Sequence, residues 1–260
     1  MPQDSVLSTT KHLRRIKVIA CEIFHREICL CAANSTCHLD LEFLPKGLHD
    51  LPTAEMRSRI QETIDRVPAD RYEAIALAFA LCNNGIAGIE ARSLPVAITR
   101  AHDCITLFLG SRKRYTDIFE QNPGTYFITT GWCERGGVST ELRRQTVLSS
   151  MGIDKTYQEY VQTYGKENAE FIMRFTGDYL RNYSRYLFIS LGLGGEEYWE
   201  TAAREDAEKK GWSFRSVRGD LRLLRMLCNG EWPEDEFLVL KPGERVTATH
   251  DGTIIAAEGG

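Results

Sequence analysis

Short apolar runs alternate with amphipathic segments through the first half of the chain. The runs predict strands at 16–20 (IKVIA), 36–43 (TCHLDLEF), 74–81 (AIALAFAL), 94–99 (LPVAIT) and 124–130 (GTYFITT). Helical spacing of the apolar positions predicts helices over about 53–67 and 102–120. Strands separated by helices of this length are typical of a parallel sheet with right-handed crossovers.

The second half begins with a different composition. Residues 139–183 are polar, rich in Tyr, Arg and Glu, and predict helices that bridge the two halves of the chain. Further strands are expected at 186–191, 212–217 and 237–240, and the end of the chain fits a hairpin with Asp251-Gly252 at its turn. We therefore expect an α/β protein of two Rossmann-like lobes with mainly parallel sheets and a central cleft. Residues 1–135 would form the N-terminal lobe, 136–185 a helical bridge, and 186–260 the C-terminal lobe.

Composition narrows the class of protein. The chain has 260 residues, of which 43% are hydrophobic, and this excludes a disordered chain. A net charge of −4 argues against nucleic acid and acidic membranes as partners. No run approaches the roughly 20 apolar residues that cross a bilayer, so we expect a cytoplasmic protein. Its eight cysteines include no Cys-x-x-Cys pair, and in the cytoplasm they should be reduced.

Residues that can bind metals follow three of the predicted strands. If these strands are neighbours in a parallel sheet, their carboxyl ends share one crevice. The side chains expected to converge there are Cys21, Cys82, His102 and Cys104. Zinc prefers thiolate and imidazole ligands, so these four predict a metal site with zinc as the expected ion. Asp103 and Glu22 lie beside these ligands and are the candidate catalytic residues.

Two other interpretations of these residues stay open. Cys21 and Cys82 can be buried core residues, with His102 a histidine at a helix start. Alternatively, one cysteine is a nucleophile that works without a metal. His49, in the loop after the second strand, can reach the same crevice, although a lone loop histidine is more often exposed to solvent.

Several residues near this crevice are candidates for binding a cofactor. Arg100, Arg112 and Tyr115 flank the helix after the fourth strand, where guanidinium groups suit carboxylate or phosphate. Trp132 follows another strand and can stack on a flat ligand. The loop after the third strand contributes Asn83 and Gly85. The simpler interpretation is a solvated basic face and a tryptophan that packs between the lobes.

Several segments together resemble an uncharacterised family of a domain of unknown function (1638). They are Ala20-Cys21, Gly47-Leu48-His49, Leu81-Cys82-Asn83-Asn84-Gly85, Arg100-Ala101-His102-Asp103-Cys104-Ile105, Pro123-Gly124-Thr125-Tyr126 and Gly131-Trp132. The resemblance implies a gene often encoded near corrinoid-dependent methyltransferases. His102-x-Cys104 with a distant cysteine is also similar to the zinc motif of methylcobamide:thiol methyltransferases. Those enzymes are TIM barrels, so that similarity would be convergent.

The residues, and secondly the resemblance, lead us to expect a protein of one-carbon metabolism that binds zinc through thiolate and imidazole ligands. It would transfer methyl groups or assist corrinoid-dependent methyl transfer, with zinc as a Lewis acid. The expected partners are a small-molecule substrate and a corrinoid protein, with a corrinoid or tetrahydrofolate as a further cofactor. The alternative is a two-lobed small-molecule-binding protein without turnover, in which the arginine cluster and Trp132 hold an anionic or flat ligand.

Overall fold

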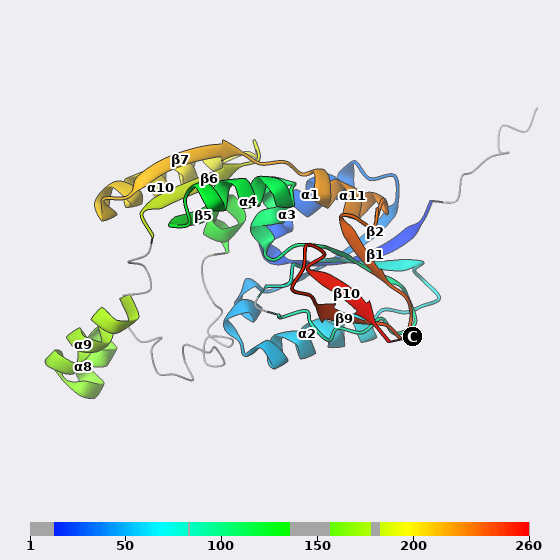
Figure 1. Ribbon diagram of the computed structural model, residues 1–260, viewed down its shortest axis with the longest axis horizontal. Coiled ribbons are helices and arrows are strands. Elements are labelled where there is room, and N and C mark those ends of the chain that lie inside the picture. Colours follow the sequence, from blue (N-terminus) through cyan, green and yellow to red (C-terminus); the bar gives the residue numbers. More distant parts are fainter. Residues whose placement is uncertain (1–12, 83, 136–156, 178–182, 260) are drawn as a thin grey trace, which may run out of the picture.

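The computed structural model describes residues 13–82, 84–135, 157–177 and 183–259. A five-stranded sheet in the order β2-β1-β3-β4-β8 forms the centre of the protein (Figure 1). Its strands are β1 (Arg15–Cys21), β2 (His38–Leu44), β3 (Ala74–Ala78), β4 (Val96–Thr99) and β8 (Phe237–Leu240). The first four run parallel and β8 runs antiparallel to β4. The predicted α/β class with mainly parallel sheets is confirmed.

Burial follows the hydrophobic pattern of each strand. Every residue of β3 and β4 is buried, as expected for parallel strands covered on both faces. β2 is an edge strand and is only partly buried. Helices α1 (His25–Ala33) and α11 (Arg222–Asn229) contact each other, and α11 also contacts β3 and β4. Helix α2 (Thr53–Asp65) buries the apolar stripe that the sequence predicts.

A second sheet has the order β5-β6-β7, and all three strands are parallel. They are β5 (Thr125–Thr129), β6 (Arg185–Ser190) and β7 (Ser213–Arg218), and helix α10 (Glu196–Lys210) packs on β6 and β7. Strand pairing does not follow the expected domain boundaries. β5 comes from residues 1–135 but pairs with β6, and β8 comes from residues 186–260 but pairs with β4. Both sheets therefore combine strands from both ends of the chain.

The expected helical bridge is described only in part. Residues 136–156 and 178–182 lie outside the described residues. Between them, α8 (Tyr157–Tyr164) and α9 (Lys166–Gly177) pack against each other (Figure 1). Within the part of the chain that the structure describes, no helix is both long and apolar enough to span a bilayer.

The expected C-terminal hairpin is confirmed. Strands β9 (Arg245–Ala248) and β10 (Ile255–Glu258) pair antiparallel, and Asp251-Gly252 lies in the connection between them. The Asp251 carboxylate accepts hydrogen bonds from the main-chain N–H of Thr253, at 2.8 Å, and from the Thr249 hydroxyl, at 3.0 Å. These bonds fix the local geometry of the turn.

Short helices follow the carboxyl ends of several strands. They are η1 (Glu22–Phe24) after β1, η2 (Lys46–Asp50) after β2, α3 (Cys104–Leu109) and α4 (Arg112–Gln121) after β4, and α5 (Thr130–Glu134) after β5. Helix α5 contacts η1. The contact is a direct backbone approach, because a Cβ added to Gly131 would lie 1.8 Å from the carbonyl oxygen of Ile23. Only glycine allows this approach, and it brings the ends of β1 and β5 together.

We predict that Gly131→Ala destabilises the protein by about 3 kcal/mol, because the added methyl group must push α5 away from η1. The measurement is urea denaturation monitored by circular dichroism. Gly194→Ala is the matched control, because a Cβ there meets no atom within 4 Å. Equal stability of the two variants would contradict the close approach.

A buried carboxyl group lies on α1. Glu27 is 1% exposed, and its Oε2 atom has no hydrogen-bond partner among the described residues. Burial raises the pKa of Glu27 to about 7, and the neighbouring carboxylates of Glu196 and Glu134 also raise it, whereas Arg26 lowers it. The folded protein therefore favours the protonated form of Glu27.

The raised pKa predicts how stability changes with pH. The unfolded chain ionises Glu27 near its ordinary pKa of 4.5, but the folded protein resists ionisation until about pH 7. The free energy of unfolding should therefore fall by about 3 kcal/mol between pH 4.5 and pH 7 because of this group. Glu27→Gln should remove that fall, which urea titrations at several pH values would measure. The exposed Glu197→Gln is the control, and an unchanged pH profile in Glu27→Gln would refute the assignment.

Candidate functional site

Three cysteines gather at the carboxyl end of the central sheet. Cys21 is the last residue of β1, Cys82 follows β3, and Cys104 begins α3 after β4. Because β1 pairs with β3 and β3 with β4, all in parallel, these strand ends are adjacent. The main-chain N–H of Cys82 donates to the carbonyl of His102 at 2.9 Å, which ties the two loops together. The strand ends that carry these three cysteines are therefore neighbours, whereas their use as metal ligands stays a prediction.

All three thiols are protonated at neutral pH. Burial raises the pKa of Cys21 and of Cys82 to about 12, and it raises the pKa of Cys104 well above its ordinary value. Each thiolate would also repel the others, and this repulsion raises the pKa of Cys82 and Cys104 further. None of these cysteines is therefore a thiolate nucleophile in the resting protein.

His49 joins this group. Its Nε2 atom lies 3.5 Å from the sulfur of Cys21, and its ring stacks on Phe79 with the ring centres 6.2 Å apart. Burial lowers the pKa of His49 to about 4, and the nearby Lys46 ammonium lowers it too. A protonated thiol therefore faces a neutral imidazole, and the contact is not a thiolate–imidazolium ion pair.

His102 is not brought to the cysteines. The carboxylate of Asp103 caps α3 by accepting from the main-chain N–H groups of Ile105, at 3.0 Å, and Thr106, at 3.4 Å. At this helix start the side chain of His102 is exposed and Cys104 is buried, and the two line different pockets. Among the described residues, no group of three or more His, Cys, Asp or Glu side chains is arranged to hold a metal ion. The structure thus does not assemble the expected four ligands.

A cavity of about 670 Å³ lies beside the cysteines. Six of its fourteen lining residues are aromatic: Tyr115, Phe119, Tyr126, Phe127, Trp132 and Tyr183. Its polar side chains include Lys46, Asp103, Cys104 and Cys133. The lining residues come from the connections after β2 and β4 and from β5 with its following helix. The cavity therefore lies between β5 and the carboxyl end of the central sheet, the edge where ligands bind in α/β proteins.

Trp132 connects the aromatic wall to the cysteines. Its indole N–H donates to the sulfur of Cys104, and the Lys46 ammonium lies 4.3 Å from the centre of its ring. The Thr129 hydroxyl caps α5 by accepting from the main-chain N–H of Trp132 at 3.2 Å. Glu22, an expected catalytic residue, accepts from the main-chain N–H of Lys46 at 2.8 Å. In this structure Glu22 therefore holds the loop that carries the pocket's cation.

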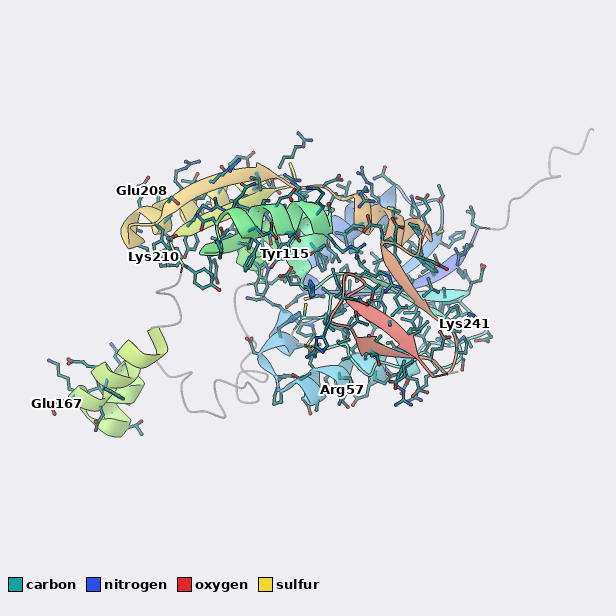
Figure 2. All side chains as sticks on the ribbon, viewed as in Figure 1. Arg57, Tyr115, Glu167, Glu208, Lys210 and Lys241 are labelled. Atoms are coloured by element: carbon teal, nitrogen blue, oxygen red, sulfur yellow. The ribbon has the colours of Figure 1, made fainter. Side chains whose placement is uncertain are left out.

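Tyr115 and Asp103 form the second polar contact of the pocket. The Tyr115 hydroxyl bonds the Asp103 carboxyl, and the ring of Tyr115 packs against Phe127 with centres 5.7 Å apart. Burial raises the pKa of both groups. The hydroxyl and the ring of Tyr115, in the middle of Figure 2, thus both contact neighbouring side chains, and these contacts hold Tyr115 in place.

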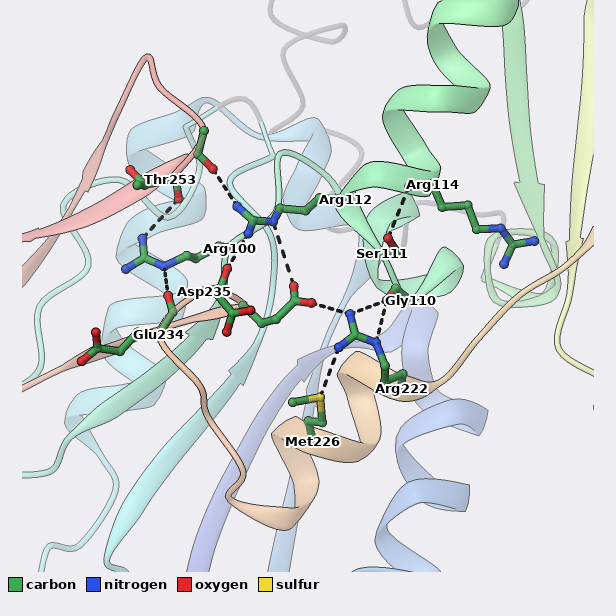
Figure 3. A network of polar contacts seen from close by, with 12 residues as sticks. Arg100, Gly110, Ser111, Arg112, Arg114, Arg222, Met226, Glu234, Asp235 and Thr253 are labelled. Atoms are coloured by element: carbon green, nitrogen blue, oxygen red, sulfur yellow. Dashed lines mark hydrogen bonds and ion pairs between the residues drawn. The ribbon is translucent and has the colours of Figure 1, made fainter.

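The two expected cofactor-binding arginines hold the C-terminal hairpin (Figure 3). Arg112 donates to the carbonyl of Gly252 at 2.6 Å and to that of Asp235. Arg100 donates to the carbonyls of Glu234, at 2.8 Å, and Thr253, at 3.2 Å. Neither arginine lines the aromatic pocket, although Arg112 lines a second one.

The loop after β3 supplies no wall of the aromatic pocket within the described residues. Asn83 lies outside the described residues. Gly85 packs on α2 instead, because a Cβ there would lie 2.5 Å from the sulfur of Met56. Position 85 therefore requires a residue without a side chain.

Three residues that line the pocket were not expected from the sequence: Lys46, Cys133 and Phe127. Lys46 follows the end of β2, so the strand-end rule that selected the cysteines also applies to it. Phe127 lies within β5, and only the pairing of the second sheet reveals that it faces the cavity.

Fold and site together define an α/β protein with an aromatic, thiol-bearing pocket at the carboxyl ends of its parallel strands. Residues 43–228 match the model of a family described as a protein of unknown function, DUF1638. The match spans most of the chain, so the chain belongs to this family and the expected resemblance is confirmed. No curated protein and no solved structure matches the chain.

Proposed function

We propose that the protein binds a small planar molecule with an anionic group, held in a cleft between two Rossmann-like lobes. The observation that carries this proposal is the cavity of about 670 Å³ at the strand ends, with its six aromatic side chains and Lys46. A cavity of this size and apolar character is typical of small-molecule sites. Residues of β5 in the second sheet and residues that follow β2 and β4 of the central sheet line it, as expected where two lobes close on a ligand.

The chemistry of the wall defines the class of ligand. Aromatic rings bury flat surfaces well and favour offset or edge contacts with another ring. The Lys46 ammonium already lies over the indole of Trp132, so a ring that stacks there meets a positive charge at its edge. A carboxylate, sulfonate or phosphate on the ring would pair with that ammonium.

Asp103 is the polar group best placed to act on such a ligand. It lines the pocket, bonds the Tyr115 hydroxyl, and has a pKa raised by burial. A carboxyl group with a raised pKa holds its proton more readily, and this suits it to donate a proton to a ligand. The Cys104 and Cys133 thiols also line the pocket, but burial raises the pKa of both, so they contact the ligand as neutral groups.

The test uses 8-anilinonaphthalene-1-sulfonate, an aromatic anion with a flat naphthalene ring system, whose fluorescence rises on binding. Lys46→Met should weaken its binding about tenfold through the lost charge, and Trp132→Leu by a similar factor through the lost ring contact. The exposed residues Lys209 and Tyr198 on α10 provide the controls Lys209→Met and Tyr198→Leu. Equal affinity in all four variants would overturn the proposal, provided that their melting temperatures match.

Metal-dependent methyl transfer in one-carbon metabolism is a second proposal. The observation that favours it is the adjacency of Cys21, Cys82 and Cys104, with the neutral imidazole of His49 at Cys21. Thiol and imidazole groups match the donor chemistry of zinc, although the described side chains are not arranged to hold a metal ion. Zinc, when bound, would supply a Lewis acid that lowers the pKa of a thiol. A corrinoid or tetrahydrofolate as methyl carrier and a corrinoid protein as partner stay predictions.

Elemental analysis of anaerobically purified protein tests the metal proposal. About one zinc, iron or cobalt per chain is expected, and Cys82→Ser should lower it severalfold because one donor is lost. Cys29→Ser is the matched control, because Cys29 is an exposed cysteine on α1. Absence of stoichiometric metal from the unmodified protein would end this proposal without affecting the ligand pocket.

A further inference from the structure

A second cavity, of about 390 Å³, lies on the other side of Tyr115. Its wall includes His102, Thr106, Arg112, Lys113, Tyr115 and Thr116. Among the described residues that line it, three can carry positive charge, three have hydroxyl groups, and none has a carboxylate. This set of donors is typical of sites that bind oxyanions.

Several guanidinium groups lie near this cavity, interspersed with carboxylates (Figure 3). The Glu236 carboxylate faces two guanidinium groups, those of Arg112 and Arg222. Arg100 lies close to Arg112 and donates to main-chain carbonyls. Burial lowers the pKa of Arg100, and the Arg112 charge lowers it further, while the carboxylates of Glu234 and Asp251 only partly offset both effects. An added anion would relieve this repulsion.

The Lys113 side chain is more exposed than those of Arg112 and Arg222. It is 82% exposed and pairs with Asp117 one turn along α4, at 2.7 Å. Such exposed pairs within a helix are weak, so an oxyanion in the cavity competes with Asp117 at little cost. Arg112 is different, because its bonds to Gly252 and Asp235 keep it at the wall.

The two cavities adjoin at one side chain. Tyr115 lines both, and Asp103, which bonds the Tyr115 hydroxyl, lies between His102 of one cavity and Cys104 of the other. A ligand that extends past the Tyr115 ring would place its two ends in chemically different surroundings. One end would meet aromatic rings, and the other would meet cations and hydroxyl groups.

We propose that the cavity lined by His102, Arg112 and Lys113 binds the terminal oxyanion, a phosphate or carboxylate group, of the ligand whose ring occupies the aromatic pocket. This inference rests on the proposed function and extends it. It identifies the ligand as an elongated molecule, flat at one end and anionic at the other. It also assigns His102, which is not grouped with the cysteines, a role in binding the oxyanion.

Proton NMR of the histidine rings tests this inference with inorganic phosphate and with acetate as separate probes. The chain has six histidines, and His102→Gln assigns the resonance of His102. Phosphate should shift the His102 resonances saturably and leave those of the exposed His38 unchanged. Lys113→Ala should weaken phosphate binding about tenfold, because a charged hydrogen bond is lost. Lys209→Ala, on α10, is the control.

The two probes distinguish the sources of the oxyanion. Saturation by phosphate at lower concentration than by acetate assigns a phosphate-bearing ligand, and the reverse order assigns a carboxylate. Equal shifts of His102 and His38, or no shift of His102 with either probe, would overturn the inference. Binding of the naphthalene sulfonate probe to the aromatic pocket is measured separately. Its loss would refute the proposed function itself.

Discussion

The backbones of Gly131 and Ile23 pack directly against each other, and this contact holds the carboxyl end of β5 in the second sheet beside that of β1 in the central sheet. Any side chain at position 131 would overlap the Ile23 carbonyl, so α5 rests on η1 with backbone against backbone. Trp132 follows at once on α5, and this places its indole against Cys104. The aromatic pocket exists because one strand end of each sheet is joined in this way, and a wider separation would open it to solvent.

Burial then determines the chemistry of the site. Burial keeps the thiols at the strand ends protonated. Burial and the positive charge of nearby Lys46 together keep His49 neutral. Such a pocket contacts a ligand mainly through its aromatic side chains, and its charged groups lie at the edge of the pocket. The guanidinium groups near the hairpin lie outside the apolar pocket and are paired with carboxylates or main-chain carbonyls. An anion can approach them there without the burial of an unpaired charge.

The sequence predicts the local elements well and the pairing between them only in part. Apolar runs identify β1, β3 and β4, and the strand-end rule then brings Cys21, Cys82 and Cys104 together. The orientation of the His102 side chain could not be predicted in the same way. It depends on the capping of α3 by Asp103, and the His-x-Cys spacing alone does not indicate that cap. Likewise, the β4–β8 and β5–β6 pairs join strands that lie far apart along the chain. Local periodicity carries no information about such pairings.

The central claim is that a planar anion binds at the strand ends against Trp132. A crystal structure of the protein with 8-anilinonaphthalene-1-sulfonate tests this claim most directly. The account predicts that the rings lie between Tyr115 and Trp132 and that the sulfonate pairs with Lys46 or reaches the cations beyond Tyr115. A ligand bound elsewhere, with the aromatic pocket filled by its own side chains, would contradict it.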